Sequence, residues 1–148
     1  YREIKKIFYK YTGWLTLLFI PILISLFIFS KSLIFLIGGE QYIKTPVSIT
    51  VLYVFLIYGI LLPVDRLTGV TLESINAPKY NFYKVLIMLA ANIIGDVIVI
   101  TYVQSIVWVA IITIIHTFIG TILGIIFLNN KLKLSFREFF NYFVMGKR

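Results

Sequence analysis

Four long apolar stretches alternate with short polar segments along the chain. The stretches cover residues 14–37, 47–76, 82–102 and 105–128. A helix needs about 20 apolar residues to cross the roughly 30 Å hydrocarbon core of a bilayer, and each stretch is that long. The pattern therefore predicts an all-α fold, a polytopic membrane bundle of four transmembrane helices within residues 13–128.

Amphipathic segments flank this predicted bundle on both sides. Residues 1–12 repeat apolar side chains at helical spacing with basic residues between them, which predicts an interfacial helix. The tail, residues 129–148, contains Ser135 and Glu138 at the spacing of a capping box. Four phenylalanines follow on one helical face: Phe136, Phe139, Phe140 and Phe143. We expect a second amphipathic helix here, lying in the plane of the membrane surface.

Composition agrees with the membrane assignment, since 60% of residues are hydrophobic and 14% are charged. A soluble domain carries roughly 45–50% apolar and about 25% charged residues. The net charge is +8, but its placement argues against a nucleic-acid partner. Eleven basic residues lie on one side of the predicted spans: Arg2, Lys5, Lys6, Lys10, Lys79, Lys84, Lys131, Lys133, Arg137, Lys147 and Arg148. This bias predicts that both termini are cytoplasmic and that the basic residues contact membrane lipids.

Patterns typical of enzymes are poor in this chain. One histidine and no cysteine do not build a usual zinc site. A phosphate-binding loop, a G-x-S-x-G motif and an aspartate-rich metal cluster are all missing from the sequence. We therefore expect no catalytic residues, no bound metal and no cofactor.

The informative residues are the polar ones inside the predicted spans, because a charge there costs roughly 2.5–3.5 kcal/mol on insertion scales and tends to face protein or water. The candidates for a substrate cavity are Asp65, Arg66, Asn92, Asp96 and His116. Arg66 is the strongest, since a guanidinium stays charged and binds phosphate oxygens through a fork of donors. Asp65 would orient Arg66 or balance its charge.

A simpler interpretation is that these polar groups only hold helices together. Gly120 and Gly124 form a GxxxG spacing, which favours close helix packing. For His116 a satisfied interior hydrogen bond is the better interpretation than a proton relay. For Asn92 interhelical contact and a cavity position are equally favoured, and Arg66 could instead pair with Asp96.

The segment from Asp65 onward resembles a known family. The strings DRLTGVTLESINAPKYNFYKV, AANIIGDVIVI and QSIVWVAIITII resemble the C-terminal part of polysaccharide-biosynthesis flippases, which belong to the multidrug, oligosaccharidyl-lipid and polysaccharide exporter superfamily. Four further features fit the family: a turn of small residues, Pro and Lys at 76–79, Asn92 in the middle of its helix, Pro21 in the first span, and the turn at 39–42 that follows it. Ser105 departs from it, since a glycine is more usual before the last span.

The resemblance implies a helix bundle around a cavity that opens alternately to each side of a bacterial inner (plasma) membrane. It implies that a lipid-diphosphate-linked oligosaccharide, such as a polysaccharide or O-antigen (lipopolysaccharide) precursor for the cell envelope, is exported by alternating access. Family members have about twelve to fourteen spans, so we expect this chain to be a fragment, the last four spans, with the remaining helices of the transporter as its partners. Two alternatives stay open: a stand-alone four-span glycolipid carrier, or a non-transporting scaffold of a glycan assembly complex.

The first prediction concerns topology. The basic residues place both termini in the cytoplasm and the segment around Gln41 outside. Because the chain has no cysteine of its own, single cysteines at Gln41 and Ser135 can be labelled in intact cells. An impermeant reagent should reach Gln41→Cys and not Ser135→Cys, and the reverse pattern would contradict the assignment.

Overall fold

The computed structural model describes residues 2–144, except the side chains of Phe136, Phe143 and Val144. The part that it describes is helical, with short connections. The elements are α1 (Arg2–Ile28), α2 (Ser30–Gly38), α3 (Glu40–Ile43), α4 (Pro46–Ser74), α5 (Pro78–Ile98), the π-helix η1 (Val99–Val103), α6 (Ile106–Leu132) and α7 (Phe136–Val144). Four helices are long and apolar enough to cross a membrane: α1, α4, α6, and α5 together with η1. The predicted all-α membrane bundle is confirmed.

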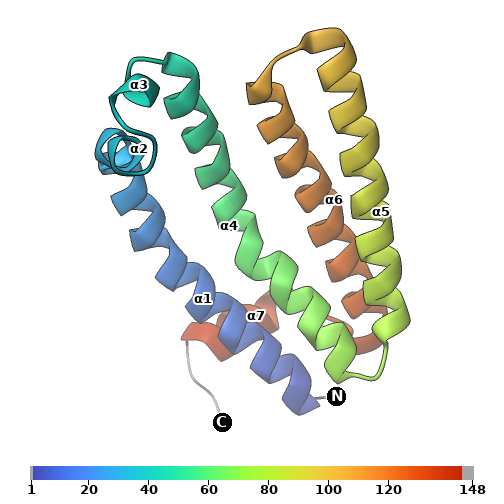
Figure 1. Cartoon of the computed structure of the whole chain (residues 1–148). Helices are drawn as coiled ribbons and strands as arrows, with labels where there is room; N and C mark the ends of the chain where they lie inside the picture. The colour runs from blue at the N-terminus through green and yellow to red at the C-terminus, as the bar shows by residue number, and fades with distance from the viewer. Residues whose placement is uncertain (1, 145–148) are drawn as a thin grey trace.

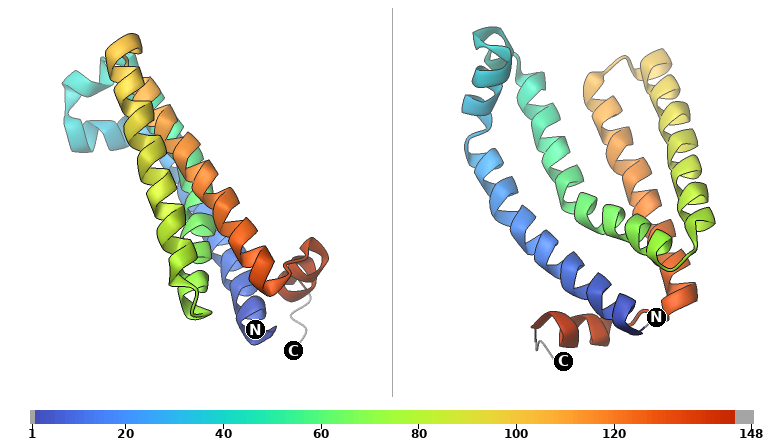
Figure 2. Two further views of the ribbon diagram at one scale, coloured as in Figure 1. Left: turned by 90° about the vertical axis from the view of Figure 1, so that its right-hand side faces the viewer. Right: turned by 60° about the horizontal axis from the view of Figure 1, so that its bottom comes forward.

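The long helices run up and down and form two adjoining pairs (Figure 1). Helix α4 contacts α1 on one side and α6 on the other, and α5 packs on α6. Helices α2 and α3 project sideways from one end of the bundle (Figure 2). At the other end, α7 lies against the first part of α1, so the two flanking segments share one side of the bundle.

The N-terminal part of the chain differs from the sequence prediction in two ways. Residues 2–12 are not a separate interfacial helix, because α1 continues through Gly13 into the first span. The single Gly13 is tolerated inside a helix at a cost of about 1 kcal/mol. The helix within the predicted span 14–37 is also interrupted, since α1 stops at Ile28 and α2 begins at Ser30 after Phe29.

The other spans lie close to their predicted ranges. Helix α4 runs 29 residues, or roughly 44 Å at 1.5 Å per residue. It contains Pro63, which has no N–H to bond the carbonyl of Gly59, and its ribbon bends along its length (Figure 2). Gly59 is buried against α1, where an added Cβ would lie 2.6 Å from Leu23 Cδ2. A small residue therefore lets α1 approach α4 near the bend.

The turn between α4 and α5 is short and defined by its backbone. Asn76 adopts a left-handed conformation with φ 58°, which asparagine tolerates better than most residues. The N–H of Ala77 then donates to the carbonyl of Leu72 at 2.9 Å, which satisfies a carbonyl at the end of α4. Pro78 starts α5 where its missing N–H costs nothing.

Most of the apolar side chains on the long helices are exposed. Ile28 of α1 and Phe82 and Ile94 of α5 expose 66%, 64% and 61% of their surface. Contiguous apolar surface of this extent is rare on monomeric soluble proteins. A bilayer or further helices must cover it, which agrees with four helices that can span a membrane.

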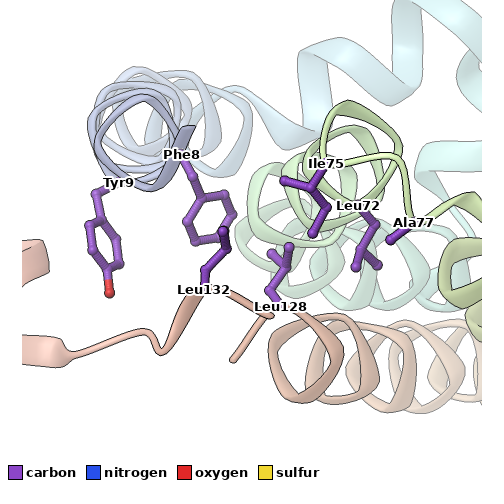
Figure 3. Packing of buried hydrophobic residues seen from close by; sticks show 7 residues of the cluster. All are labelled: Phe8, Tyr9, Leu72, Ile75, Ala77, Leu128 and Leu132. Atoms are coloured by element: carbon purple, nitrogen blue, oxygen red, sulfur yellow. The ribbon is translucent and has the colours of Figure 1, made fainter. Parts of the chain in front are cut away.

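The largest buried apolar cluster lies at the end of the bundle where α1, α4 and α6 meet (Figure 3). Its members are Phe8, Tyr9, Leu72, Ile75, Ala77, Leu128 and Leu132. Tyr9 also bonds the tail: its hydroxyl donates to the carbonyl of Ser135 at 3.0 Å and accepts from the N–H of Ser135 at 2.6 Å. Phe139 packs edge-on against the Tyr9 ring. The segment before α7 is thereby fixed to α1.

These contacts replace the predicted capping box. Glu138 forms an ion pair with Lys5, and the N–H of Ser135 goes to Tyr9 instead of to Glu138. Lys5 Nζ also donates to the carbonyl of Lys133 at 2.6 Å. The predicted tail helix exists as α7, but its expected phenylalanine face includes Phe136 and Phe143, whose side chains lie outside the described residues, as do Lys147 and Arg148.

The second prediction concerns this contact. Tyr9→Phe removes both hydrogen bonds to Ser135 and keeps the ring, so the tail should be held less tightly by about 1 kcal/mol. Hydrogen exchange of the backbone over residues 136–144 should become faster by several-fold. Tyr11→Phe is the matched control, since Tyr11 is on the same helix and 56% exposed; equal exchange in both variants would show that the Tyr9 hydroxyl does not hold α7.

Candidate functional site

A cavity of about 400 Å³ lies among α4, α5 and α6. Apolar side chains such as Val70, Val85 and Leu89 form part of its wall. Its polar lining is Tyr58, Asp65, Arg66, Glu73, Asn81, Lys84, Asn92, His116 and Thr117. Four of the five predicted cavity residues are thus brought together, and Asp96 is the exception.

Helix α4 supplies most of the charge in this cavity. Asp65, Gly69 and Glu73 follow one another at a spacing of four residues, so they share a face of the helix. Arg66 lines the cavity as well. This face of α4 therefore lies toward the cavity that α4 forms with α5 and α6.

Asp65 forms a buried ion pair with Lys84 of α5, which the sequence did not suggest. The two charged atoms lie 2.8 Å apart, and the Lys84 side chain exposes 3% of its surface. Lys84 Nζ also donates to the carbonyl of Asp65 at 2.9 Å and to Thr68 Oγ1 at 3.2 Å. The pair joins the two helices of the α4–α5 hairpin inside the apolar bundle.

Two expectations change as a result. Lys84 is not one of the basic residues at the membrane surface, because its four-carbon side chain turns inward from α5. Asp65 does not orient Arg66 or balance its charge, since Asp65 is already occupied by Lys84.

Arg66 is left as the accessible cation of the cavity. Its side chain is exposed, and it forms no ion pair within residues 2–144. The alternative pairing with Asp96 is not found either, because Asp96 accepts a hydrogen bond from Asn92 of its own helix at 2.8 Å. A guanidinium with five free donors can bind an oxyanion in this position.

Thr68 connects the ion pair to helix α6. Its hydroxyl donates to the carbonyl of Asp65 at 2.7 Å and accepts from Lys84, and the residue is fully buried. A Cβ on Gly124 would collide with the Thr68 side chain, and one on Gly120 would collide with Met88 of α5. Both glycines of the GxxxG spacing therefore lie where α6 meets its neighbours.

A second polar contact joins α4 and α5 beside the ion pair. Asn81 Nδ2 donates to Glu73 Oε1 at 2.7 Å. Gly69 leaves the room for this contact, since an added Cβ would lie 2.9 Å from Asn81 Oδ1. Glu73 is exposed, so its charge is more strongly screened than that of Asp65.

His116 and Asp96 each retain a polar atom without a partner. His116 Nδ1 and Asp96 Oδ1 are buried and accept or donate no hydrogen bond within the described part of the chain. The prediction that His116 makes a satisfied interior hydrogen bond is therefore wrong for Nδ1. Asn92 donates its hydrogen bond within α5, to Asp96, and it also lines the cavity. This favours the prediction of a cavity position for Asn92 over the prediction of a contact between helices.

Searches with this sequence match no protein-family model, no curated protein and no solved structure. In the described residues, three or more His, Cys, Asp or Glu side chains do not gather in a group that could hold a metal ion. The geometry of the cavity is thus the main guide to its chemistry. It combines the accessible guanidinium of Arg66, the Asp65–Lys84 ion pair, amide groups and the Glu73 carboxylate, which accepts a hydrogen bond from Asn81.

The third prediction compares the two glycines. Gly124→Ala would push on Thr68, which two hydrogen bonds hold in place, whereas Gly120→Ala would push on a flexible methionine. Gly124→Ala should destabilise the protein by about 1–3 kcal/mol, and Gly120→Ala by less. Thermal unfolding of the two variants in the same lipid measures the difference. Equal unfolding midpoints, or a larger loss for Gly120→Ala, would contradict the rigid contact with Thr68.

Proposed function

We propose that this chain is the last four spans of a flippase that moves a lipid-diphosphate-linked oligosaccharide across a bacterial inner membrane by alternating access. The α4–α6 cavity would form part of the substrate path, and the remaining helices of the transporter would complete it. Two independent arguments support the proposal. One is the resemblance of residues 65–115 to polysaccharide flippases, and the other is the charge arrangement in the cavity.

The observation that carries the proposal is the accessible guanidinium of Arg66. Arg66 lines the cavity while the adjacent Asp65 is paired with Lys84. An arginine within a membrane span is costly unless it faces protein or water. A diphosphate offers two adjacent groups of oxygens, which match the planar fork of donors on a guanidinium.

The other lining groups fit the same substrate class. Asn92 offers an amide and His116 an imidazole to the cavity, and both kinds of group form hydrogen bonds with sugar hydroxyls. The apolar walls, including Val85 and Leu89, suit the start of an isoprenoid chain. The exposed apolar faces of α1 and α5 are where the missing helices and the lipid would pack.

The fourth prediction tests the role of Arg66 in export. In cells that produce the complete transporter, Arg66→Ala should abolish glycan export while the protein is inserted at normal abundance, because the diphosphate loses its cation. Arg66→Lys keeps the charge and loses the fork, so it should export partially. Glycan at the cell surface and transporter in the membrane fraction are measured together.

Arg137→Ala is the matched control, since Arg137 is an exposed arginine on α7 outside the cavity. It should leave export unchanged. Normal export by an abundant Arg66→Ala protein would refute the binding role. Loss of protein rather than loss of export would instead show that Arg66 holds helices together.

A further inference from the structure

We propose that Lys84 is a positioning residue that makes the cavity selective for anions by neutralising Asp65, without touching the ligand itself. The inference rests on the proposed function, since it concerns how the Arg66 site keeps its attraction for a phosphate group.

Lys84 is held within the protein by three contacts of its ammonium group. Lys84 Nζ donates hydrogen bonds to the Asp65 carbonyl at 2.9 Å and to Thr68 Oγ1 at 3.2 Å, and it forms an ion pair with Asp65 Oδ1 at 2.8 Å. The side chain is 3% exposed. Because its charge is paired with Asp65 and its side chain is almost fully buried, Lys84 does not present its ammonium group to a ligand, although it is part of the cavity wall.

The charges of the cavity show why this pairing matters. Asp65, Glu73, Arg66 and Lys84 line it, so their formal charges cancel. Glu73 is exposed and bonded to Asn81, and its effect on a ligand is screened. Asp65 is buried, with 8% of its surface exposed, and an unpaired carboxylate there would repel an anion at Arg66 through a medium of low dielectric constant.

This arrangement predicts opposite effects for the two partners of the ion pair. Lys84→Met leaves a buried negative charge beside Arg66 and should weaken anion binding. Asp65→Asn removes that charge and should strengthen it. The double variant restores neutrality and should bind like the unmodified protein, because neither side chain contacts the ligand.

The test uses the whole chain in lipid nanodiscs with farnesyl diphosphate as the probe, and farnesol as the control for its apolar tail. Arg66→Gln should remove the binding that depends on the diphosphate. Lys84→Met should weaken diphosphate binding by about tenfold. Asp65→Asn should tighten it by several-fold, and the double variant should return within about twofold of the unmodified protein.

Two control variants separate charge from other effects. Lys84→Arg keeps a cation beside Asp65 and should bind within a few-fold of the unmodified protein. Lys10→Met removes an exposed lysine from α1 and should change nothing. If Lys84→Met does not fold, the inference is tested by Asp65→Asn and by the double variant. Diphosphate binding by Asp65→Asn that is unchanged or weaker overturns the inference. Weak diphosphate binding by a folded double variant overturns it as well.

The outcomes distinguish this inference from the proposed function. Diphosphate binding that survives Arg66→Gln overturns the anion site of the proposed function, and the inference with it. Binding that is lost in Arg66→Gln but unchanged in Lys84→Met overturns the inference alone. Equal weakening in Lys84→Met and in the double variant would show that Lys84 is itself a ligand of the phosphate, which also overturns it.

Discussion

The ion pair between Lys84 and Asp65 is the constraint on which the rest of the bundle depends. A buried charge without a partner is strongly destabilising, by about 3–5 kcal/mol when one member of a pair is removed. Lys84 and Asp65 lie on different helices, so α4 and α5 must stay together for either charge to be tolerated. The short turn at Asn76 brings them within reach, and Thr68 adds a third partner that packs on Gly124 of α6.

The same pair determines what the cavity can bind. Asp65 and Arg66 are neighbours in the sequence, but only Asp65 is neutralised by Lys84. The guanidinium of Arg66 therefore remains available to a ligand in the cavity. Asp65 is paired with Lys84 and Glu73 accepts a hydrogen bond from Asn81, whereas Arg66 has no ion-pair partner among the described residues, so a cavity whose formal charges cancel can still attract an anion.

Hydropathy was sufficient to predict the four spans, because the cost of exposing a backbone to lipid leaves few alternatives to a helix. Sequence alone placed Arg66, Asp65, Asn92 and His116 as cavity residues, since charged and amide groups in a span face protein or water. It missed Lys84 because an inward-turning lysine looks like one at the membrane surface. The spacing of Lys84, Met88 and Asn92, four residues apart on α5, was the available signal. The tail contact was also missed, since Tyr9 and Ser135 are 126 residues apart.

The central claim is that Arg66 gives the cavity a positive local potential although Asp65 is next to it. A single cysteine at Val70, which lines the cavity one helical turn from Arg66, measures that potential in a chain without other cysteines. A sulfonate methanethiosulfonate should react there faster than a trimethylammonium reagent of similar size, after correction for their rates with a free thiol. Arg66→Gln should reverse the preference. A preference for the cationic reagent, or one that Arg66→Gln leaves unchanged, would contradict the account.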